Sequence, residues 1–458
     1  MDHLPTSLFC DRALLPTGWA SAVRLSWHNG RFDQVQQGAR MAAGEARLAL
    51  AIPGLANLHS HAFQRAMAGL AERRGPTADS FWTWREVMYR FLDHLNPDDV
   101  AVIAAQAYAE MLEAGFTRVG EFHYLHHDPT GHPYANLAVM AEAIADAAAR
   151  SGIGLTLLPC FYAQGGFGGA PPTRGQIRFL NTPKGFAGLL QQSQRAIATL
   201  PHAVLGLAPH SLRAVTPDQL RAILPLCPSG PVHIHVAEQI AEVEACIGAT
   251  GQRPVEWLLN QQSVDARWCL IHATHMTDAE TVSLAASGAT AGLCPITEAS
   301  LGDGVFPAAA FLAAGGRFGI GTDSNVQIDA AAELRQLEYG QRLTHRARNV
   351  LADAETGSTG LSLFQAALAG GAALGAGGGG FSPGQSADVV GLDPAHPSLA
   401  GKPAEAIIDS HIFAAARPAI TDVWCQGVAR VRGGRHGQAA EIGAAYAATV
   451  WRLLDRTR

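Results

Sequence analysis

Two short segments carry histidines at a spacing that suits a metal ion. His59 and His61 are two positions apart, so in a strand both imidazoles lie on one face, about 6.6 Å apart. His233 and His235 repeat this spacing, and we expect His235 to bind because it is nearer the carboxyl end of its strand. In a chain with 19 histidines such pairs also arise by chance. A further histidine group has no such regular spacing and consists of His123, His126 and His127.

Three more polar side chains follow apolar runs that we expect to be strands. Glu238 comes three residues after His235 and must lie beyond the strand end to face the same centre, whereas His272 and Asp323 each follow a run directly. Each of these residues also has a structural explanation. Glu238 fits the first turn of a helix, Asp323 fits a helix N-cap, and His272 fits a histidine that forms a structural hydrogen bond. Together, three histidines and one carboxylate suit a divalent ion such as Zn²⁺ with an open position for water.

Such an ion would supply a nucleophile at neutral pH, because it lowers the pKa of a bound water from about 15.7 to about 7. The predicted ligands are His59, His61, His235 and Asp323. Glu238 and His272 then remain as candidates for proton transfer and for stabilising the charge that develops in the reaction.

Two arginines are placed to receive a carboxylate. Arg85 follows the segment Phe81–Trp84, and Arg213 follows the apolar run Val204–Pro209 by a few residues. The planar guanidinium forms paired, charge-assisted hydrogen bonds with carboxylates. On spacing alone, each is equally a surface arginine. If both face the site, the substrate carries two carboxylates, or one carboxylate that is held twice.

The elements that must position these residues repeat along the chain. Eight short apolar runs end in polar residues, and most of the gaps have helical patterns such as Val100–Ala114, Leu137–Ser151 and Pro254–Gln261. This alternation predicts a parallel sheet covered by helices, closed as a (β/α)8 TIM-like barrel in the α/β class. An open doubly wound sheet is the alternative, although no GxGxxG follows the first run. The runs are Ala51–Leu58, Phe116–Gly120, Gly154–Cys160, Val204–Pro209, Val232–Val236, Trp268–Ile271, Ala289–Leu293 and Phe318–Gly321.

The two ends of the chain have a different pattern. Residues 1–52 and 382–458 contain short strand-like segments, and a helix is predicted near the end of the chain. We expect both ends to form one small β-sandwich domain beside a barrel of residues 53–381. The predicted elements of the ends are the strands Ser21–Trp27, Ala387–Gly391 and Asp422–Gly433 and the helix Ala444–Leu454.

Composition limits the environment and the partners. The chain has 458 residues, a net charge of −6 and no basic stripe, so we expect no nucleic-acid partner. Seven scattered cysteines without a CxxC pair indicate reduced thiols in the cytoplasm. Residues 1–19 lack the pattern of a signal peptide. The longest uncharged stretch, Thr356–Ala387, is broken by Gly377–Gly380 and by Pro383, so we expect a helix that ends in a glycine turn, not a membrane span.

The segments PGLANLHSH, HVAE, LIHA and GTDS, in this order, resemble the deaminase branch of the metal-dependent amidohydrolase superfamily. The resemblance covers almost the whole chain. It implies that the four predicted ligands bind the metal, that Glu238 relays protons and that His272 is the histidine of the sixth strand. Binuclear members usually carry a carboxylated lysine at the fourth strand. The two lysines, Lys184 and Lys402, lie outside the predicted strands, so we expect one metal ion per subunit.

Longer segments, HSHAFQRAMAG, FWTWREVMY, GEFHYLHHD and LAPHSLRAV, are similar to those of the N-formimino-L-glutamate deiminases of histidine degradation. This resemblance implies hydrolysis of a carboxylate-bearing small molecule to N-formyl-L-glutamate and ammonia, with Glu238, His272 and Asp323 as the catalytic groups. It also implies a homodimer. A deaminase for guanine, cytosine or an adenosine-like ring is the alternative, and a metal-binding barrel without catalysis is a more distant one. The side chains that the resemblance assigns to the glutamate portion are Gln64, Arg85, Tyr124, His210 and Arg213.

Overall fold

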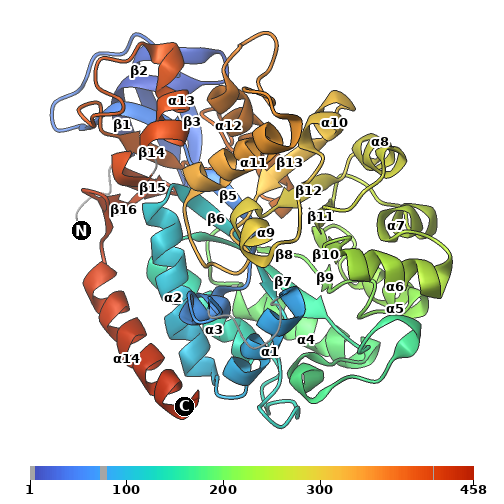
Figure 1. Cartoon of the computed structure of the whole chain (residues 1–458). Coiled ribbons are helices and arrows are strands. Elements are labelled where there is room, and N and C mark those ends of the chain that lie inside the picture. Colours follow the sequence, from blue (N-terminus) through green and yellow to red (C-terminus); the bar gives the residue numbers. More distant parts are fainter. Residues whose placement is uncertain (1–5, 73–79, 416, 458) are drawn as a thin grey trace.

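The computed structural model describes residues 6–72, 80–415 and 417–457. Residues 1–5 and 458, the outer ends of the two predicted terminal segments, lie outside the described residues. A ring of parallel strands surrounded by helices forms the centre of the molecule, and a sheet built from both chain ends lies beside it (Figure 1).

The parallel strands form two sheets, ordered β5-β6-β7-β8, with β9 also on β7, and β10-β11-β12-β13. Single bridges join them on both sides, Leu207 with Val232 and Ser60 with Asp323. The ring therefore closes, and the predicted (β/α)8 barrel is confirmed. Its strands are β5 (Leu55–Ser60), β6 (Phe116–His123), β7 (Gly154–Phe161), β8 (Val204–Leu205), β9 (Ala208–Pro209), β10 (Val232–Val236), β11 (Trp268–His272), β12 (Thr290–Leu293) and β13 (Arg317–Ile320).

Two of the predicted apolar runs are each divided between two strands in the structure. Val204–Pro209 is divided into β8 and β9, because Gly206 approaches the carbonyl of Pro231 closely. Ala51–Leu58 is shared between β4 of the outer sheet and β5 of the barrel, and Gly54 at the junction packs against Thr117 with no room for a Cβ atom. In both cases a glycine in close contact with another segment, with the Thr117 side chain or with the Pro231 carbonyl, lies where the apolar run is divided.

Helices cover the outer face of the barrel (Figure 1). The start of α2 shows why they begin where they do, since the Asn96 side chain accepts the Asp99 N–H and Pro97 opens the helix. The helices are α1 (Phe81–Leu92), α2 (Pro97–Glu113), α3 (Val139–Ser151), α4 (Pro183–Ala196), α5 (Pro217–Ile223), α6 (Ile240–Thr250), α7 (Pro254–Gln261), α8 (Asp278–Ser287), α9 (Pro295–Leu301), α10 (Ala308–Ala313), α11 (Ala330–His345), α12 (Thr359–Gly370) and α13 (Ile407–Ser410).

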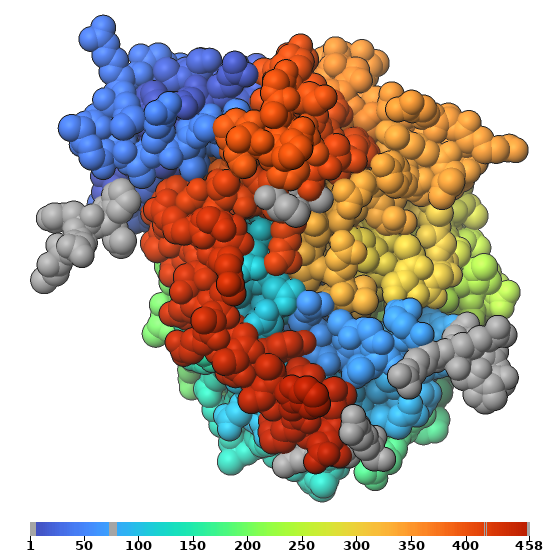
Figure 2. Space-filling model, turned by 60° about the vertical axis from the view of Figure 1, so that its left-hand side comes forward, coloured from blue at the N-terminus to red at the C-terminus, as the bar shows by residue number. Residues whose placement is uncertain are grey.

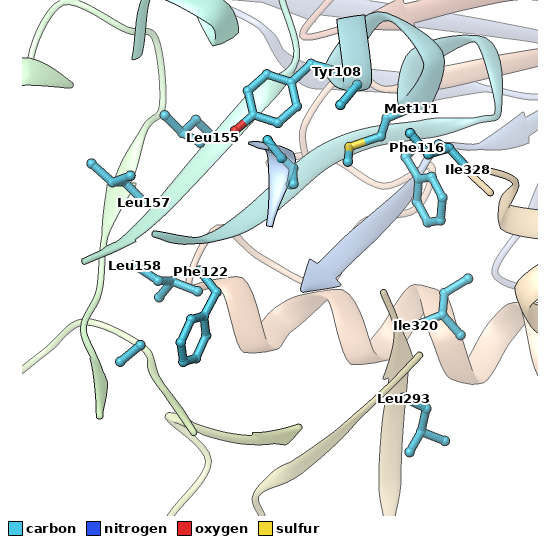
Figure 3. Close-up of a cluster of buried hydrophobic side chains, with 14 of the residues drawn as sticks. Tyr108, Met111, Phe116, Phe122, Leu155, Leu157, Leu158, Leu293, Ile320 and Ile328 are labelled. Atoms are coloured by element: carbon cyan, nitrogen blue, oxygen red, sulfur yellow. The ribbon is translucent and has the colours of Figure 1, made fainter. Parts of the chain in front are cut away.

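The main core lies between these layers. Every residue of β6 and β7 is buried, because side chains on one face fill the barrel and those on the other contact helices. Figure 3 shows part of this core, with Tyr108 and Met111 from α2 and Phe116 and Phe122 from β6. Burying such side chains contributes about 1.5–3 kcal/mol each, so the strand ends that carry the polar groups are held on a rigid support.

The strands of both chain ends form one eight-stranded sheet among the described residues, ordered β17-β16-β15-β14-β4-β1-β2-β3. Its own hydrophobic core includes Trp27, Phe32 and Trp424. The predicted strand Asp422–Gly433 is a hairpin, because Gln426 and Gly427 both have positive φ and reverse the chain. The bounds are β1 (Ser7–Leu15), β2 (Gly18–His28), β3 (Arg31–Gln36), β4 (Ala46–Pro53), β14 (Val389–Leu392), β15 (Ile420–Cys425), β16 (Val428–Arg432) and β17 (Arg435–His436).

The final helix, α14 (Ala439–Thr457), extends the predicted segment at both ends and packs along α2. Figure 2 shows this C-terminal segment passing from the outer sheet across the side of the barrel. The predicted helix before the glycine turn corresponds to α12. The division into domains at residues 52/53 and 381/382 stays a prediction. Among the described helices, none has the length and apolar character needed to cross a membrane.

Candidate active site

The carboxyl ends of β5, β10 and β13 bring the four predicted ligands together. The Nε2 atoms of His59 and His61 lie 3.2 and 3.3 Å from Oδ1 of Asp323. The Nε2 atom of His235 lies 3.0 Å from that of His59. One ligand atom from each of the four side chains falls within 4.8 Å of the others, and no second such group occurs among the described residues. The backbone brings His59 and Asp323 together, since the Asp323 N–H donates to the His59 carbonyl at 2.9 Å.

Hydrogen bonds orient two of the imidazoles. Nδ1 of His61 donates to the Phe122 carbonyl, and Nδ1 of His235 donates to the His210 carbonyl, each at 2.9 Å. These bonds leave both Nε2 atoms directed at the shared centre, as in histidines that bind metals. Of the two histidines on β10, His235 belongs to this group. Nε2 of His233 instead contacts the Ala373 carbonyl at 3.1 Å.

The protonation states also suit a metal ion. Burial lowers the pKa of His59 to about 3 and also lowers the pKa values of His61 and His235, so their imidazoles are neutral at pH 7. Burial opposes ionisation of Asp323, but its hydrogen bond with His59 and the nearby imidazoles hold its pKa well below the usual range. Three neutral imidazoles and one carboxylate are the forms that bind a divalent cation, so these residues fit the implied ion.

Glu238 and His272 lie beside this centre. The chain turns at Ala237, which has φ of 51°, and this places Glu238 beyond the end of β10, as its spacing required. Nε2 of His272 is 3.9 Å from Oε1 of Glu238 and 3.9 Å from Oδ2 of Asp323. Burial raises the pKa of Glu238 to about 7. Burial would lower the pKa of His272, but the charge of Glu238, the hydrogen bond to Glu298 and the charge of Asp323 outweigh it and raise this pKa to about 10.

Glu298, on α9, is a buried acid that sequence reasoning missed. Its Oε1 atom lies 3.2 Å from Nδ1 of His272 and accepts the Cys294 N–H at 2.9 Å. The carboxylate thus holds the edge of the His272 imidazole that points away from Glu238. A glutamate in the first turn after the β12 strand end was the available signal, but that position is typical of helix caps and does not by itself indicate a partner.

One pocket joins this centre to the predicted substrate-binding residues. Its empty volume of about 570 Å³ includes space that is open to solvent. Aromatic side chains that the sequence did not single out form much of its wall, notably Tyr89, Tyr162 and Phe179. The predicted residues that line it are His61, Gln64, Arg85, Tyr124, His210, Arg213, His235, Glu238, His272 and Asp323.

Several polar groups of the pocket have no protein partner among the described residues. Nε2 of Gln64 donates to the Tyr124 hydroxyl at 2.9 Å, whereas its Oε1 atom is buried and without a partner. The buried Nε atoms of Arg85 and Arg213 also lack partners. The closest carboxylate oxygen to Arg213 is Oε2 of Glu238, 3.9 Å from its Nη2. The pocket therefore brings cationic donors and the histidine–carboxylate centre together in one space.

Other predicted features lie away from the centre. Lys184, on α4, and Lys402 are both exposed and outside the barrel strands, so the lysine that would bridge two metals is absent from this site, as expected. The histidine group at the end of β6 is also buried. Nε2 of His126 contacts the Cys160 carbonyl at 2.8 Å and Nε2 of His127 contacts the Leu180 carbonyl at 2.6 Å, whereas Nε2 of His123 has no partner among the described residues.

Known proteins resemble this chain along nearly its whole length. Formimidoylglutamate deiminase from Pseudomonas aeruginosa is 48% identical over 453 residues, covering 98% of this chain and 100% of that protein. A 5-methylthioadenosine/S-adenosylhomocysteine deaminase from Nitratidesulfovibrio vulgaris is 30% identical over 77% of this chain and 73% of its own length. The crystal structure of an amidohydrolase from Brucella melitensis matches with a TM-score of 0.95 and 54% identity, over 98% of this chain and 99% of that one.

Structures of lower identity show the same fold. A zinc-bound adenosine deaminase from Xanthomonas campestris superposes with a TM-score of 0.79 at 24% identity, over 99% of this chain and 98% of its own. The model of the amidohydrolase family matches residues 50–430, which include the barrel and all the residues of the centre described above. The chain therefore belongs to the amidohydrolase family.

Proposed function

We propose that this chain is a formimidoylglutamate deiminase, which hydrolyses N-formimino-L-glutamate to N-formyl-L-glutamate and ammonia. The observation that carries the proposal is a single pocket that is lined both by a histidine–carboxylate centre and by two arginines. The deiminase from Pseudomonas aeruginosa, 48% identical over its whole length, supports the same activity.

We propose one Zn²⁺ ion per chain, held by His59, His61, His235 and Asp323. Three nitrogens and one oxygen within 4.8 Å of one another are a donor set typical of catalytic zinc. When bound, the ion supplies a water molecule of lowered pKa and polarises the carbon that is attacked. The two lysines are exposed and lie outside the barrel strands, which supports one ion rather than a bridged pair.

The proton transfers fall to Glu238. With a pKa near 7, its carboxylate accepts a proton from the attacking water and returns one to the imino nitrogen. His272 donates from Nε2 to the oxygen on the tetrahedral carbon, and Asp323 holds the water on its other side. Glu238 then takes the hydroxyl proton of that carbon and delivers it to the amino nitrogen, so that collapse expels ammonia and leaves the formyl group.

The glutamate portion of the substrate is assigned to the part of the pocket that the two arginines line. Arg85 and Arg213 receive the two carboxylates, because their guanidinium groups have unpaired N–H donors. Gln64 and Tyr124, already hydrogen-bonded to each other, and His210 complete the contacts. Holding both carboxylates places the formimino carbon at the centre, where a displacement of about 1 Å can cost on the order of 100-fold in rate.

For its setting, we propose a cytoplasmic homodimer that acts in histidine degradation. Seven separate free cysteines support a reducing compartment, and the dimer follows the commonest symmetry of soluble oligomers. Sedimentation equilibrium of the purified chain tests the dimer directly, since a monomer mass at micromolar concentration would contradict it.

A substrate panel tests the activity. Ammonia release is measured with N-formimino-L-glutamate, guanine, cytosine and 5-methylthioadenosine, and we expect turnover with the first alone. Turnover with a ring substrate instead would assign the chain to the ring deaminases of its family. Arg213→Ala should lower kcat/KM for N-formimino-L-glutamate by about 100-fold through loss of a charge-assisted pair, and an unchanged value would remove Arg213 from the substrate site.

A further inference from the structure

The two arginines of the pocket share one aromatic ring. The guanidinium carbon of Arg85 lies 4.6 Å from the ring centroid of Trp82, and that of Arg213 lies 5.7 Å from the same centroid. Both distances are within the range of a cation–π contact. Trp82 and Arg85 are on α1, whereas Arg213 follows β9, so the indole connects two loops of the barrel that are far apart in the sequence.

Arg85 is held by aromatic contacts and not by an acid. The Tyr89 ring lies 5.5 Å from its guanidinium carbon, in addition to the closer indole of Trp82. Tyr89 packs tightly against Gly175, where a Cβ atom would overlap its ring. Among the described residues no carboxylate pairs with Arg85, and its buried Nε atom has no partner. The ring contacts hold the planar group while its N–H donors stay free.

Trp82 contacts both arginines but does not itself line the pocket. Arg85 and Arg213 belong to the pocket wall as described, and Trp84 belongs to it as well, but Trp82 does not. Trp82 therefore acts on a ligand through the arginines that it contacts. Two cations brought into one pocket repel each other, and the negative face of an aromatic ring offsets part of that repulsion without using their hydrogen-bond donors.

We propose that Trp82 is a positioning residue that makes the pocket selective for dicarboxylates, because its indole holds the Arg85 and Arg213 guanidinium groups together with their N–H edges free. The inference rests on the proposed function, which supplies the dicarboxylate substrate. The ring fixes both arginines before the substrate arrives, and such preorganisation increases affinity by reducing the ordering that binding requires.

The test compares two substrates that differ by one charge, N-formimino-L-glutamate and N-formimino-L-glutamine. Trp82→Leu should lower kcat/KM about 30-fold for the dicarboxylate and about threefold for the amide, with kcat for the dicarboxylate within about threefold of wild type. Trp82→Phe keeps a ring face and should restore most of the selectivity. Trp451→Leu, at a tryptophan that is 72% exposed on α14, is the matched control and should change neither value.

A loss that is equal for both substrates would overturn the proposal, because damage to the fold lowers the amount of active enzyme without changing its selectivity. A second series avoids folding effects by placing mono-, di- and trifluorinated tryptophan at residue 82. Fluorine weakens the ring face at nearly constant shape, so selectivity for the dicarboxylate should fall stepwise. Selectivity that is independent of fluorination would also overturn the proposal.

Failure of the proposed function gives a different result. Wild-type enzyme that releases no ammonia from N-formimino-L-glutamate would overturn the function, and calorimetry with glutarate then decides the role of Trp82. Glutarate that binds wild type at least tenfold more tightly than Trp82→Leu supports the proposal. Equal affinities, or no binding to either protein, would overturn it.

Discussion

Two buried groups of three histidines occur in this barrel, and they behave differently. His59, His61 and His235 come from two strand ends, and each brings a ligand atom within 4.8 Å of the others and of one from Asp323. In the second group, which follows β6, the side chains of His126 and His127 bind backbone carbonyls instead. Both groups are buried and largely neutral, so neither burial nor the number of histidines distinguishes a metal site from structural packing.

The difference lies in what the imidazoles share. In the first group the Nδ1 atoms of His61 and His235 are occupied by carbonyls, and the three histidines and Asp323 bring one ligand atom each within 4.8 Å of the others. In the second group the Nε2 atoms of His126 and His127 are occupied instead, and among the described residues no carboxylate gathers the three rings into such a group. The first group therefore differs from the second by a charged ligand from another strand and by ligand atoms that gather at one point.

The largest expected effect is loss of the metal. His235→Ala should remove the bound ion and reduce turnover by more than about 1,000-fold, since a primary ligand is lost. His126→Ala should keep one ion per chain and cost only stability, about 1–3 kcal/mol for the hydrogen bond and the packing that are removed. Metal analysis by inductively coupled plasma mass spectrometry and ammonia assays measure both variants. An ion lost equally from both would refute the contrast between the groups.

The next effect concerns the acid beside the first group. Glu238→Gln should bind the metal normally yet lower kcat by about 1,000-fold, because the amide cannot accept a proton. Metal content serves as the control for this variant, measured on the same preparation. Near-normal kcat with full metal occupancy would exclude Glu238 from proton transfer.

A smaller effect is expected at Glu298, the acid that holds His272. In the second group carbonyl oxygens hold the histidines, whereas His272 is held by a carboxylate at 3.2 Å. Glu298→Gln should lower kcat by about 10- to 100-fold with little change in KM, as is usual for residues that orient a functional histidine. Glu298→Ala provides the comparison, and a Gln variant with wild-type kcat would mean that the contact has no role in turnover.

The last effect is on stability and not on turnover, and it depends on pH. Burial lowers the pKa of His123 to about 3, against about 6.5 in the unfolded chain. Below pH 6.5 the unfolded chain therefore binds a proton that the folded chain does not, and stability falls by about 1.4 kcal/mol per pH unit towards pH 3. His123→Gln should make this slope shallower by that amount, measured by urea unfolding between pH 7 and 4. Parallel slopes for wild type and variant would contradict the assignment.

Much of the barrel could be predicted from the sequence, because parallel strands buried on both faces appear as uninterrupted apolar runs. The end of β10 shows how far this extends: the strand stops at Val236, the chain turns at Ala237, and Glu238 reaches the centre as its spacing required. The division of two apolar runs into separate strands, at Gly54 and at Gly206, was not predictable, since the close contacts of these glycines involve distant segments of the chain.

The metal ligands of the candidate site could be predicted, because histidine and aspartate side chains bind metal ions directly. Histidines and acids at strand ends indicate a metal site without knowledge of their neighbours. The roles of Glu298 and Trp82 depend on three-dimensional contacts, with His272 in one case and with two arginines in the other. Glu298 reads only as an acid near the start of a helix, and Trp82 reads only as one of several aromatic residues in a helix. Both patterns occur in many folds, so neither one indicates a contact partner.

The most direct test of the central claim is product analysis with N-formimino-L-glutamate before and after removal of the metal by a chelator, with ammonia, formamide and glutamate quantified separately. We expect ammonia and N-formyl-L-glutamate, which is quantified as well, in equal amounts, with loss of turnover on chelation and recovery with added Zn²⁺. Glutamate and formamide would mean that the other C–N bond is cut, and turnover unaffected by chelation would contradict a role for the His59–His61–His235–Asp323 centre.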